Sequence, residues 1–249
     1  MKTMKAAVYP ASRLYYEKVI PSIKSLMVNS DVDRIFLTIE DDEYPEYLPE
    51  CVTAINAGKV FGQYLNPQGP NISRTPYVWL CMIRVVYSEV FLKQYGCDRV
   101  LALDGDTIVM KDIGSEPWTM DLEGCHFAGV AERKISASIG RPYANMGVSI
   151  FDLNRIHQDG LDSVMLGAIN REPFMWLEQD VINKFCKLKP IGSEWNACQF
   201  TAPILPQDIK IRHFAYEPGW ENAQFIRDIH DIPWETIEKI WKDRKKCDK

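Results

Sequence analysis

The sequence predicts an α/β fold in which a mostly parallel sheet is flanked by helices. Short apolar runs alternate with helical patterns along the first half of the chain, which is typical of strand–helix–strand units. The chain has 249 residues, 46% of them hydrophobic and 25% charged, so it has enough apolar material for a sizeable core. Because no internal repeat or low-complexity tract divides it, we expect one domain over residues 1–249.

The first four expected elements follow this alternation. They are a strand at 5–9, a helix at 12–27, and strands at 33–39 and 51–56. The helix is expected to turn Leu14, Val19, Ile23 and Leu26 inward, because these apolar residues recur at helical spacing.

A long helix and a central strand are expected next. Residues 61–76 carry three prolines among asparagines and glycines, so they are expected to form a loop. A helix is expected over 77–95, ended by Gly96, and residues 98–103 are expected to form a central strand. The remaining expected elements are strands at 126–131, 145–151 and 209–214 and helices at 154–168, 179–188 and 234–245.

Two acids, Asp104 and Asp106, lie around Gly105 directly after the central strand. Ligands of open α/β sheets bind at this edge, beyond the carboxyl ends of the strands. Carboxylate oxygens suit hard divalent cations such as magnesium or manganese, and a glycine between them lets the backbone turn closely around the metal. A tight hairpin turn is the alternative, although the flanks of the pair are apolar and do not alternate as hairpin flanks do.

His213 is the best candidate for a third metal ligand. It ends the run IKIRHF, so it also sits at the carboxyl end of an expected strand. Imidazole binds manganese alongside carboxylates. A hydrogen-bonded strand histidine without a metal is the alternative reading of this residue alone.

Charge and cysteine content exclude several classes of protein. The net charge of −5 argues against a general nucleic-acid binder. The seven cysteines include no CxxC pair and read as free thiols of a cytoplasmic protein, and no apolar stretch suggests secretion or a membrane span. The basic cluster that ends the 234–245 helix is either a solvated helix end or a weak membrane contact.

Several short motifs occur in order over about 140 residues. They are WLCMIRVVY (with Arg84), RVLALDGDTIV, YANMGVSIFDL (Asn145 and Gly147), LEQDVINKF (Glu178, Gln179 and Asp180), the pair Trp195–Asn196 and the ending IRHFAYEPGW. In these motifs the chain resembles glycosyltransferase family 8. Members of that family are retaining enzymes of the GT-A fold and include glycogenin-like and bacterial galactosyl- and glucosyltransferases.

The resemblance implies a metal-dependent enzyme that moves a hexose from a UDP-sugar to an acceptor hydroxyl. It implies a GT-A fold with a nucleotide-binding half (about 1–110) and a half for the donor sugar and the acceptor (about 111–249). The implied cofactor is manganese, with magnesium as the alternative, held by Asp104, Asp106 and His213. The acceptor stays open: a glycan, a lipid-linked sugar, a protein or a small molecule.

The resemblance also implies residue roles. Arg84 would approach the phosphates or the sugar, and Asn145 would hydrogen-bond the donor sugar where Gly147 allows a close backbone approach. The implied catalytic residues are Glu178, which would grip sugar hydroxyls, and Gln179, nearest the anomeric carbon. The full implied donor-binding set is Tyr9, Arg84, Asp104, Gly105, Asp106, Asn145, Gly147, Glu178, Gln179, Asp180, Gly219 and Trp220.

Two departures from the family pattern stand out. Glu178 replaces the first aspartate of an Asp-Gln-Asp motif, which can alter the sugar accepted. The lysine of the family's Lys-Pro-Trp ending is missing, since residues 217–220 read Glu-Pro-Gly-Trp, and Arg212 or Lys210 are the candidates to replace it. For stacking on the base, both Tyr9 and Tyr15 are candidates.

Two other functions are compatible with part of this pattern. A GT-A-like protein that binds a sugar nucleotide without efficient catalysis would fit the missing lysine. A sugar-phosphate nucleotidyltransferase would share a related fold and an acidic metal site, but its glycine-rich basic signature is missing near the first strand.

Overall fold

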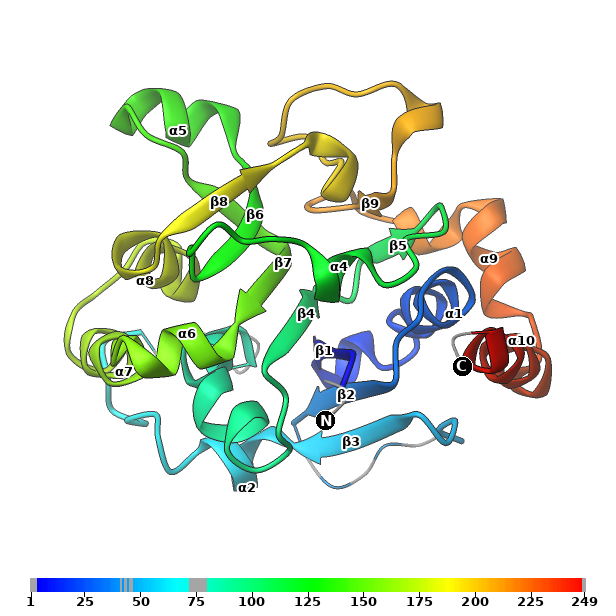
Figure 1. Ribbon diagram of the computed structural model, residues 1–249, viewed down its shortest axis with the longest axis horizontal. Coiled ribbons are helices and arrows are strands. Elements are labelled where there is room, and N and C mark those ends of the chain that lie inside the picture. Colours follow the sequence, from blue (N-terminus) through cyan, green and yellow to red (C-terminus); the bar gives the residue numbers. More distant parts are fainter. Residues whose placement is uncertain (1–3, 41, 43, 45–46, 72–79, 248–249) are drawn as a thin grey trace.

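A computed structural model describes residues 4–40, 42, 44, 47–71 and 80–247 of the protein. Its central sheet consists of β1 (Ala6–Ala11), β2 (Arg34–Ile39), β3 (Val52–Asn56), β4 (Arg99–Leu103), β6 (Phe127–Ala131), β7 (Ala144–Asp152) and β8 (Leu188–Ile191). The strand order is β3-β2-β1-β4-β7-β6-β8 (Figure 1). Only β7 runs antiparallel to its neighbours, β4 and β6. The predicted α/β fold with a mostly parallel sheet is therefore confirmed.

A second, two-stranded sheet pairs β5 (Thr107–Val109) with β9 (Ile211–His213). The strands β4 and β5, which flank Asp104–Asp106, thus belong to different sheets. The hairpin alternative for the two acids is therefore wrong. The pairing of Thr107 with His213 also brings the histidine beside the acids.

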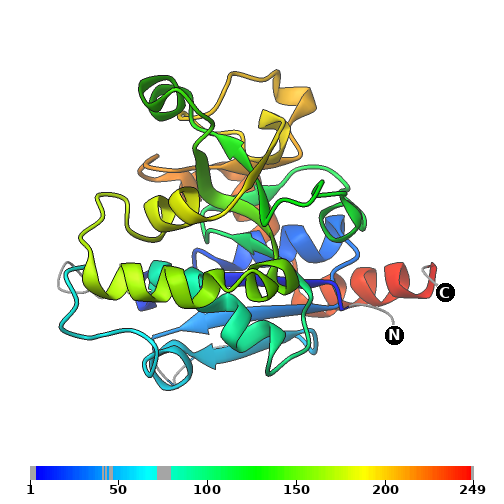
Figure 2. The ribbon, with the colours of Figure 1, turned by 60° about the vertical axis from the view of Figure 1, so that its left-hand side comes forward.

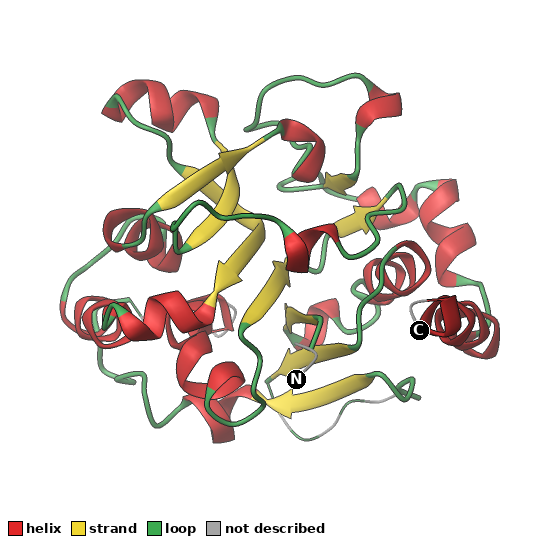
Figure 3. Cartoon of the chain, viewed as in Figure 1, coloured by secondary structure: helices red, strands yellow, loops and turns green. Residues whose placement is uncertain are grey.

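Helices cover both faces of the central sheet (Figures 2 and 3). They are α1 (Ile20–Asn29), α2 (Ala57–Phe61), α4 (Glu116–Thr119), α5 (Arg133–Ile139), α6 (Leu153–Gln158), α7 (Leu161–Arg171), α8 (Leu177–Phe185), α9 (Gln224–His230) and α10 (Trp234–Cys247). Short helical turns add η1 (Arg13–Tyr15), η3 (Ile83–Val86), η4 (Ser88–Leu92), η5 (Ser193–Trp195), η6 (Pro206–Asp208) and η7 (Trp220–Asn222).

Two apolar clusters, one on each face of the sheet, form most of the core. Alternate residues of β1 point to opposite faces, so Val8 belongs to the cluster that includes residues of α7 and α8, while Ala7 belongs to the cluster that includes residues of α1 and α10. Strands buried on both faces read as continuous apolar runs, which explains why β1 and β4 were readable from the sequence.

The helix expected over 12–27 begins later than its apolar pattern suggests. The segment first forms the 3₁₀ turn η1, and α1 starts at Ile20, with Pro21 in its first turn, where proline is favoured. Val19, Ile23 and Leu26 are buried as expected, but Leu14 is 84% exposed. The helical spacing does not apply to Leu14 because it precedes the helix.

Two other expected helices are irregular. The 154–168 helix is divided into α6 and α7 at Gly160, whose φ of 70° ends regular helical geometry. The described part of the 77–95 helix passes through the 3₁₀ turn η3 and the π-helical turn η4. Residues 77–79 lie outside the described residues. The strands β5 and β8 were not foreseen.

Ion pairs tie the basic end of α10 to neighbouring segments of the protein. Arg244 binds Asp112 (Nη2–Oδ1 2.7 Å) and Lys245 binds Asp33 (Nζ–Oδ1 2.7 Å). Two of the cations that suggested a membrane contact are therefore used within the protein. In the part of the chain that the structure describes, no helix is both long enough and apolar enough to cross a bilayer.

Candidate active site

The acidic loop lies at the carboxyl end of β4, between the two sheets. The Asp104 amide donates to the Gly147 carbonyl (2.8 Å), which continues the pairing of β4 with β7. The Phe214 amide donates to the Asp106 carbonyl (2.9 Å), which continues the pairing of β5 with β9. Backbone hydrogen bonds from two sheets therefore fix both acids.

Asp104, Asp106 and His213, together called the acidic group below, form a cluster suited to a divalent cation. His213 Nε2 lies 3.4 Å from Asp106 Oδ1 and 3.7 Å from Asp104 Oδ2, and one ligand atom from each residue lies within 4.8 Å of the others. Both carboxylates are partly exposed, and the imidazole is buried. Two oxygens and one nitrogen at this spacing fit manganese or magnesium with positions left open for a substrate.

The orientation of His213 is set by its other ring nitrogen. Nδ1 donates to Asn196 Oδ1 (2.9 Å), because the Asn196 amide nitrogen is itself donating to Asn145 Oδ1. In the neutral ring this leaves the Nε2 lone pair to face the two acids, as a metal ligand requires. Asn196, noted in the sequence only as part of a Trp-Asn pair, is thus the residue that selects the tautomer.

Gly147 makes room for the His213 ring. A Cβ at this position would collide with the imidazole of His213, so any other residue would displace the ring from the acids. In this structure the group that closely approaches the Gly147 backbone is therefore the His213 ring. Gly105, by contrast, has room for a Cβ against Tyr15 and Val19.

A chain of hydrogen bonds continues from Asn145 to Gln179. Asn145 and Gln179 both donate through their side-chain amides to Glu132 Oε1, at 2.8 and 3.1 Å. Gln179 Oε1 in turn accepts from the Met146 amide (3.0 Å). These hydrogen bonds tie the Gln179 side chain to β7 and to Glu132.

Glu132 is a site residue that the sequence reading missed. It directly follows β6 and is buried. The rule that singled out Asp104, an acid at the carboxyl end of a strand, applies equally to Glu132.

Arg84 joins the acidic group to the start of α8. Its guanidinium binds Asp104 through Nη2 and Glu178 through Nη1 (3.0 Å to Oε1), and its side chain is 2% exposed. Burial disfavours the charge, but the two carboxylates outweigh it and raise the pKa of Arg84. Burial raises the pKa of Glu178, while Arg84 opposes this and holds the pKa of Asp104 down against burial.

Other expected donor-binding residues have different surroundings. Tyr9 is fully buried, and its hydroxyl accepts from Ser22 Oγ (3.2 Å). Asp180 uses both carboxylate oxygens within the protein, for the Tyr143 hydroxyl and the Trp176 amide. These contacts hold the strand β7 and the start of α8 in place.

A cavity of about 300 Å³ opens beside Asp106. It is lined by Tyr15, Lys18, Asp106, Phe214, Tyr216, Glu217, Pro218, Gly219, Trp220 and Glu221. Gly219 (φ 76°) starts the turn that places Trp220 flat against Phe214, with ring centroids 5.2 Å apart. Of the two tyrosines proposed for base stacking, Tyr15 lines this cavity.

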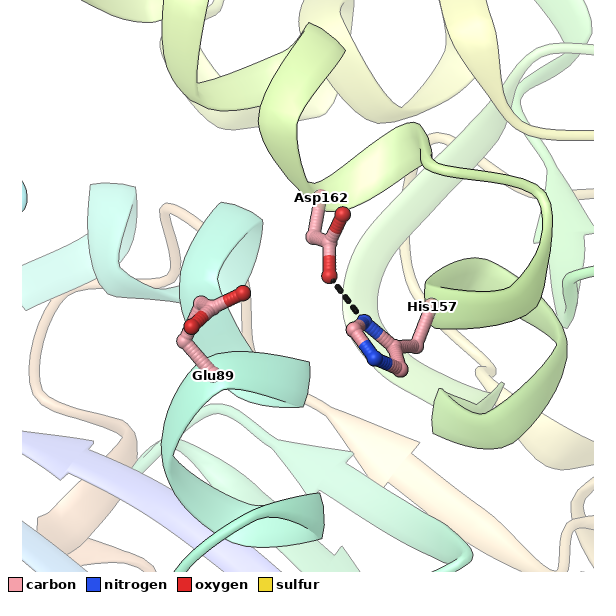
Figure 4. A group of neighbouring side chains, drawn as sticks. All are labelled: Glu89, His157 and Asp162. Atoms are coloured by element: carbon pink, nitrogen blue, oxygen red, sulfur yellow. Dashed lines mark hydrogen bonds and ion pairs between the residues drawn. The ribbon is translucent and has the colours of Figure 1, made fainter.

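A second group with metal-type ligands lies between η4, α6 and α7. It consists of Glu89, His157 and Asp162 (Figure 4). His157 Nδ1 lies 2.6 Å from the buried Asp162 carboxylate, and Lys93 donates to Glu89 at 2.8 Å. Both acids therefore have partners within the protein, and we assign no ligand to this group.

Metal binding at His213 is expected to release about one proton. Burial would lower the pKa of His213, but hydrogen bonds to Asp106 and Cys198 and the nearby acids raise it from 6.5 to about 10. The protonated histidine stabilises the metal-free fold fully below pH 6.5, and this contribution is lost as the pH rises to about 10. Since a metal must displace the proton, manganese affinity should rise about tenfold per pH unit between about pH 7 and 9.

Calorimetry in two buffers of different ionisation enthalpy would count the released protons. A manganese affinity that does not change over this pH range would contradict His213 as a ligand.

The sequence matches the family model for glycosyl transferase family 8 over residues 9–218. This match covers most of the chain and includes the acidic group. The chain belongs to glycosyl transferase family 8. A search of curated protein sequences gives no significant match for this chain.

Solved structures of glycosyltransferases share the GT-A fold of this chain. The apo bifunctional glycosyltransferase WbbM has a TM-score of 0.68 at 14% identity, and GlyE of Streptococcus pneumoniae TIGR4 has 0.67 at 15%. The match covers 97% and 98% of this chain, but the chain spans only 52% of WbbM and 64% of GlyE. The galactosyltransferase LgtC, solved with donor and acceptor sugar analogues, has a TM-score of 0.60 at 15% identity, with 96% of this chain and 99% of LgtC covered.

Proposed function

We propose that the protein is a metal-dependent, retaining glycosyltransferase that moves a hexose from a UDP-sugar to an acceptor hydroxyl. The observation that carries this proposal is the group formed by Asp104, Asp106 and His213 at the carboxyl edge of the sheet. The family membership and the likeness to LgtC support it. The acceptor remains open among glycans, lipid-linked sugars, proteins and small molecules.

The three ligands of this group would hold manganese, or magnesium in its place. Such an ion supplies a Lewis acid that offsets the charge developing on the departing nucleoside diphosphate. Asp104 is shared with Arg84, whose permanent charge keeps the carboxylate ionised and ready to bind a cation. Nδ1 of His213 stays protonated on Asn196, so the ring presents Nε2.

Glu178 and Gln179 would form the wall beneath the donor sugar. Glu178 is buried and held by Arg84, so its carboxylate can accept hydrogen bonds from sugar hydroxyls. Gln179 is an amide, and an amide is a poor nucleophile, so a double displacement of the kind used by retaining glycosidases is disfavoured. The chemistry then favours substitution on one face, with the leaving phosphate helping to deprotonate the acceptor and Gln179 stabilising the oxocarbenium-like state.

A protein that only binds a sugar nucleotide is the second candidate. The lysine of the family's C-terminal ending is missing here, where the chain has Glu217, Pro218 and Gly219. This observation favours weak catalysis. The two functions differ in whether the donor is consumed.

The proposal is tested with UDP-glucose, UDP-galactose and UDP-N-acetylglucosamine, each with and without manganese. We expect at least one donor to raise the melting temperature only when manganese is present, and to be hydrolysed slowly without an acceptor. Stabilisation without hydrolysis would indicate the binding protein. No stabilisation by any UDP-sugar would overturn both candidates.

Gln179→Ala is expected to lower kcat by about 10²- to 10³-fold, because a group that stabilises transition-state charge is removed. The affinity for UDP should change little, since the Gln179 side chain contacts β7 and Glu132. The matched control is Gln224→Ala on α9, where the glutamine is exposed and binds Asp228. Full activity of Gln179→Ala would rule out its place at the anomeric carbon.

A further inference from the structure

The cavity beside Asp106 is lined by more acidic side chains than basic ones. Its lining includes Asp106, Glu217 and Glu221, and of the described residues that line it only Lys18 is a cation. The pyrophosphate of a nucleotide sugar carries about two negative charges at neutral pH. A bound metal offsets part of this charge, and a protein cation is needed beside it.

Arg212 and Lys210, the cations suggested by the sequence, are not among the residues that line this cavity. Arg212 pairs with Glu217, donates to the Ala197 carbonyl (2.8 Å) and lies over the Phe214 ring. Lys210 pairs with Glu116 (2.7 Å) and lies over the Trp195 ring. Arg212 thus contacts two lining residues, Glu217 and Phe214, but both cations already have partners and neither lines the cavity itself.

Lys18 has the position and the freedom to bind an anion here. It lies between η1 and α1, close in sequence to Tyr15, and its Nζ is 5.5 Å from the centre of the Tyr15 ring. Nζ donates to Glu221 Oε1 (2.8 Å), and the side chain is 37% exposed. An ammonium group has three donors, so it can keep Glu221 and still bind a phosphate oxygen.

The Glu221 carboxylate holds Lys18 at the cavity wall. One of its oxygens binds Lys18, and the other, Oε2, is shielded from solvent and has no hydrogen-bond partner. The lysine lowers the pKa of Glu221, so the pair is charged at neutral pH. The segment 217–221 thus keeps a cation beside Asp106, although this cation comes from the opposite end of the sequence.

We propose that Lys18 is the residue that binds the diphosphate of the donor, in place of the lysine missing from the C-terminal motif. This inference rests on the proposed function. Lys18 lies near the N-terminus, outside the C-terminal motif in which the family has its lysine.

The test is the binding of UDP with manganese to Lys18→Met, measured by calorimetry. Loss of a charge-assisted hydrogen bond should weaken UDP binding by about ten- to a hundredfold. Lys18→Arg should recover part of the affinity. Lys210→Met is the matched control, since it removes the same charge from an ion pair outside the cavity, and it should bind UDP as the wild type does.

Uridine, which has no phosphate, separates loss of charge from damage to the cavity. Its affinity, measured by ligand-observed NMR, should be equal in the wild type and in Lys18→Met. The inference is overturned if Lys18→Met binds UDP as tightly as the wild type, or if UDP and uridine weaken equally. Absence of UDP binding by the wild type would instead overturn the proposed function, and the role of Lys18 with it.

Discussion

Asp106→Asn is expected to abolish manganese-dependent donor binding and to lower turnover by at least about 10³-fold. The substitution removes one of the two proposed carboxylate ligands, the one whose Oδ1 lies 3.4 Å from His213 Nε2. Lewis-acid stabilisation is worth several kcal/mol, and about 4 kcal/mol corresponds to 10³ in rate. The measurement is turnover of the active UDP-sugar over a series of manganese concentrations.

A matched control is Asp243→Asn on α10, where the carboxylate is exposed and binds Lys246. This variant should keep the manganese dependence of the wild type. If Asp106→Asn reached the wild-type rate at saturating manganese, the acidic group would not be the metal site.

Arg84→Met is expected to lower the free energy of unfolding by about 3 kcal/mol. Removing the cation leaves the Glu178 carboxylate buried without a counter-charge, and breaking a buried pair costs about 3–5 kcal/mol. We place the loss at the low end of this range because Asp104, the second partner, is partly exposed. Urea unfolding of the metal-free protein measures the change.

The loss should depend on pH and on metal. Without Arg84 the pKa values of Asp104 and Glu178 rise, so protonation at acidic pH removes part of the penalty. Manganese should restore part of the lost free energy of unfolding, since the ion supplies a new counter-charge to Asp104. Arg155→Met, which breaks an exposed pair with Asp159 on α6, is the control and should cost less than about 1 kcal/mol. A midpoint for Arg84→Met equal to that of the wild type would contradict the role of the buried pair.

Much of the fold is readable from the sequence because the core strands are apolar on both faces. The runs that became β2, β4 and β6 stand out against their polar borders. The short strands β5 and β8 lack this signal, since pairing with a distant partner stabilises them.

The types of side chain in the candidate site, and their order along the chain, follow from sequence patterns alone. An acid pair after a buried strand and a histidine at the end of another made a shared metal site one of two interpretations, and the family resemblance favoured it. Family membership was also readable, because the motifs lie in order.

Which of these side chains meet depends on how the sheets and helices pack. The pairing of β5 with β9 brings His213 to Asp106, and Gly147 is needed there because the imidazole lies against it. Tyr9 is drawn into the core, whereas Lys18 meets Glu221 from the far end of the chain. Sequence patterns report local periodicity, but contacts between residues more than a hundred positions apart depend on sheet register and packing, which no local pattern records.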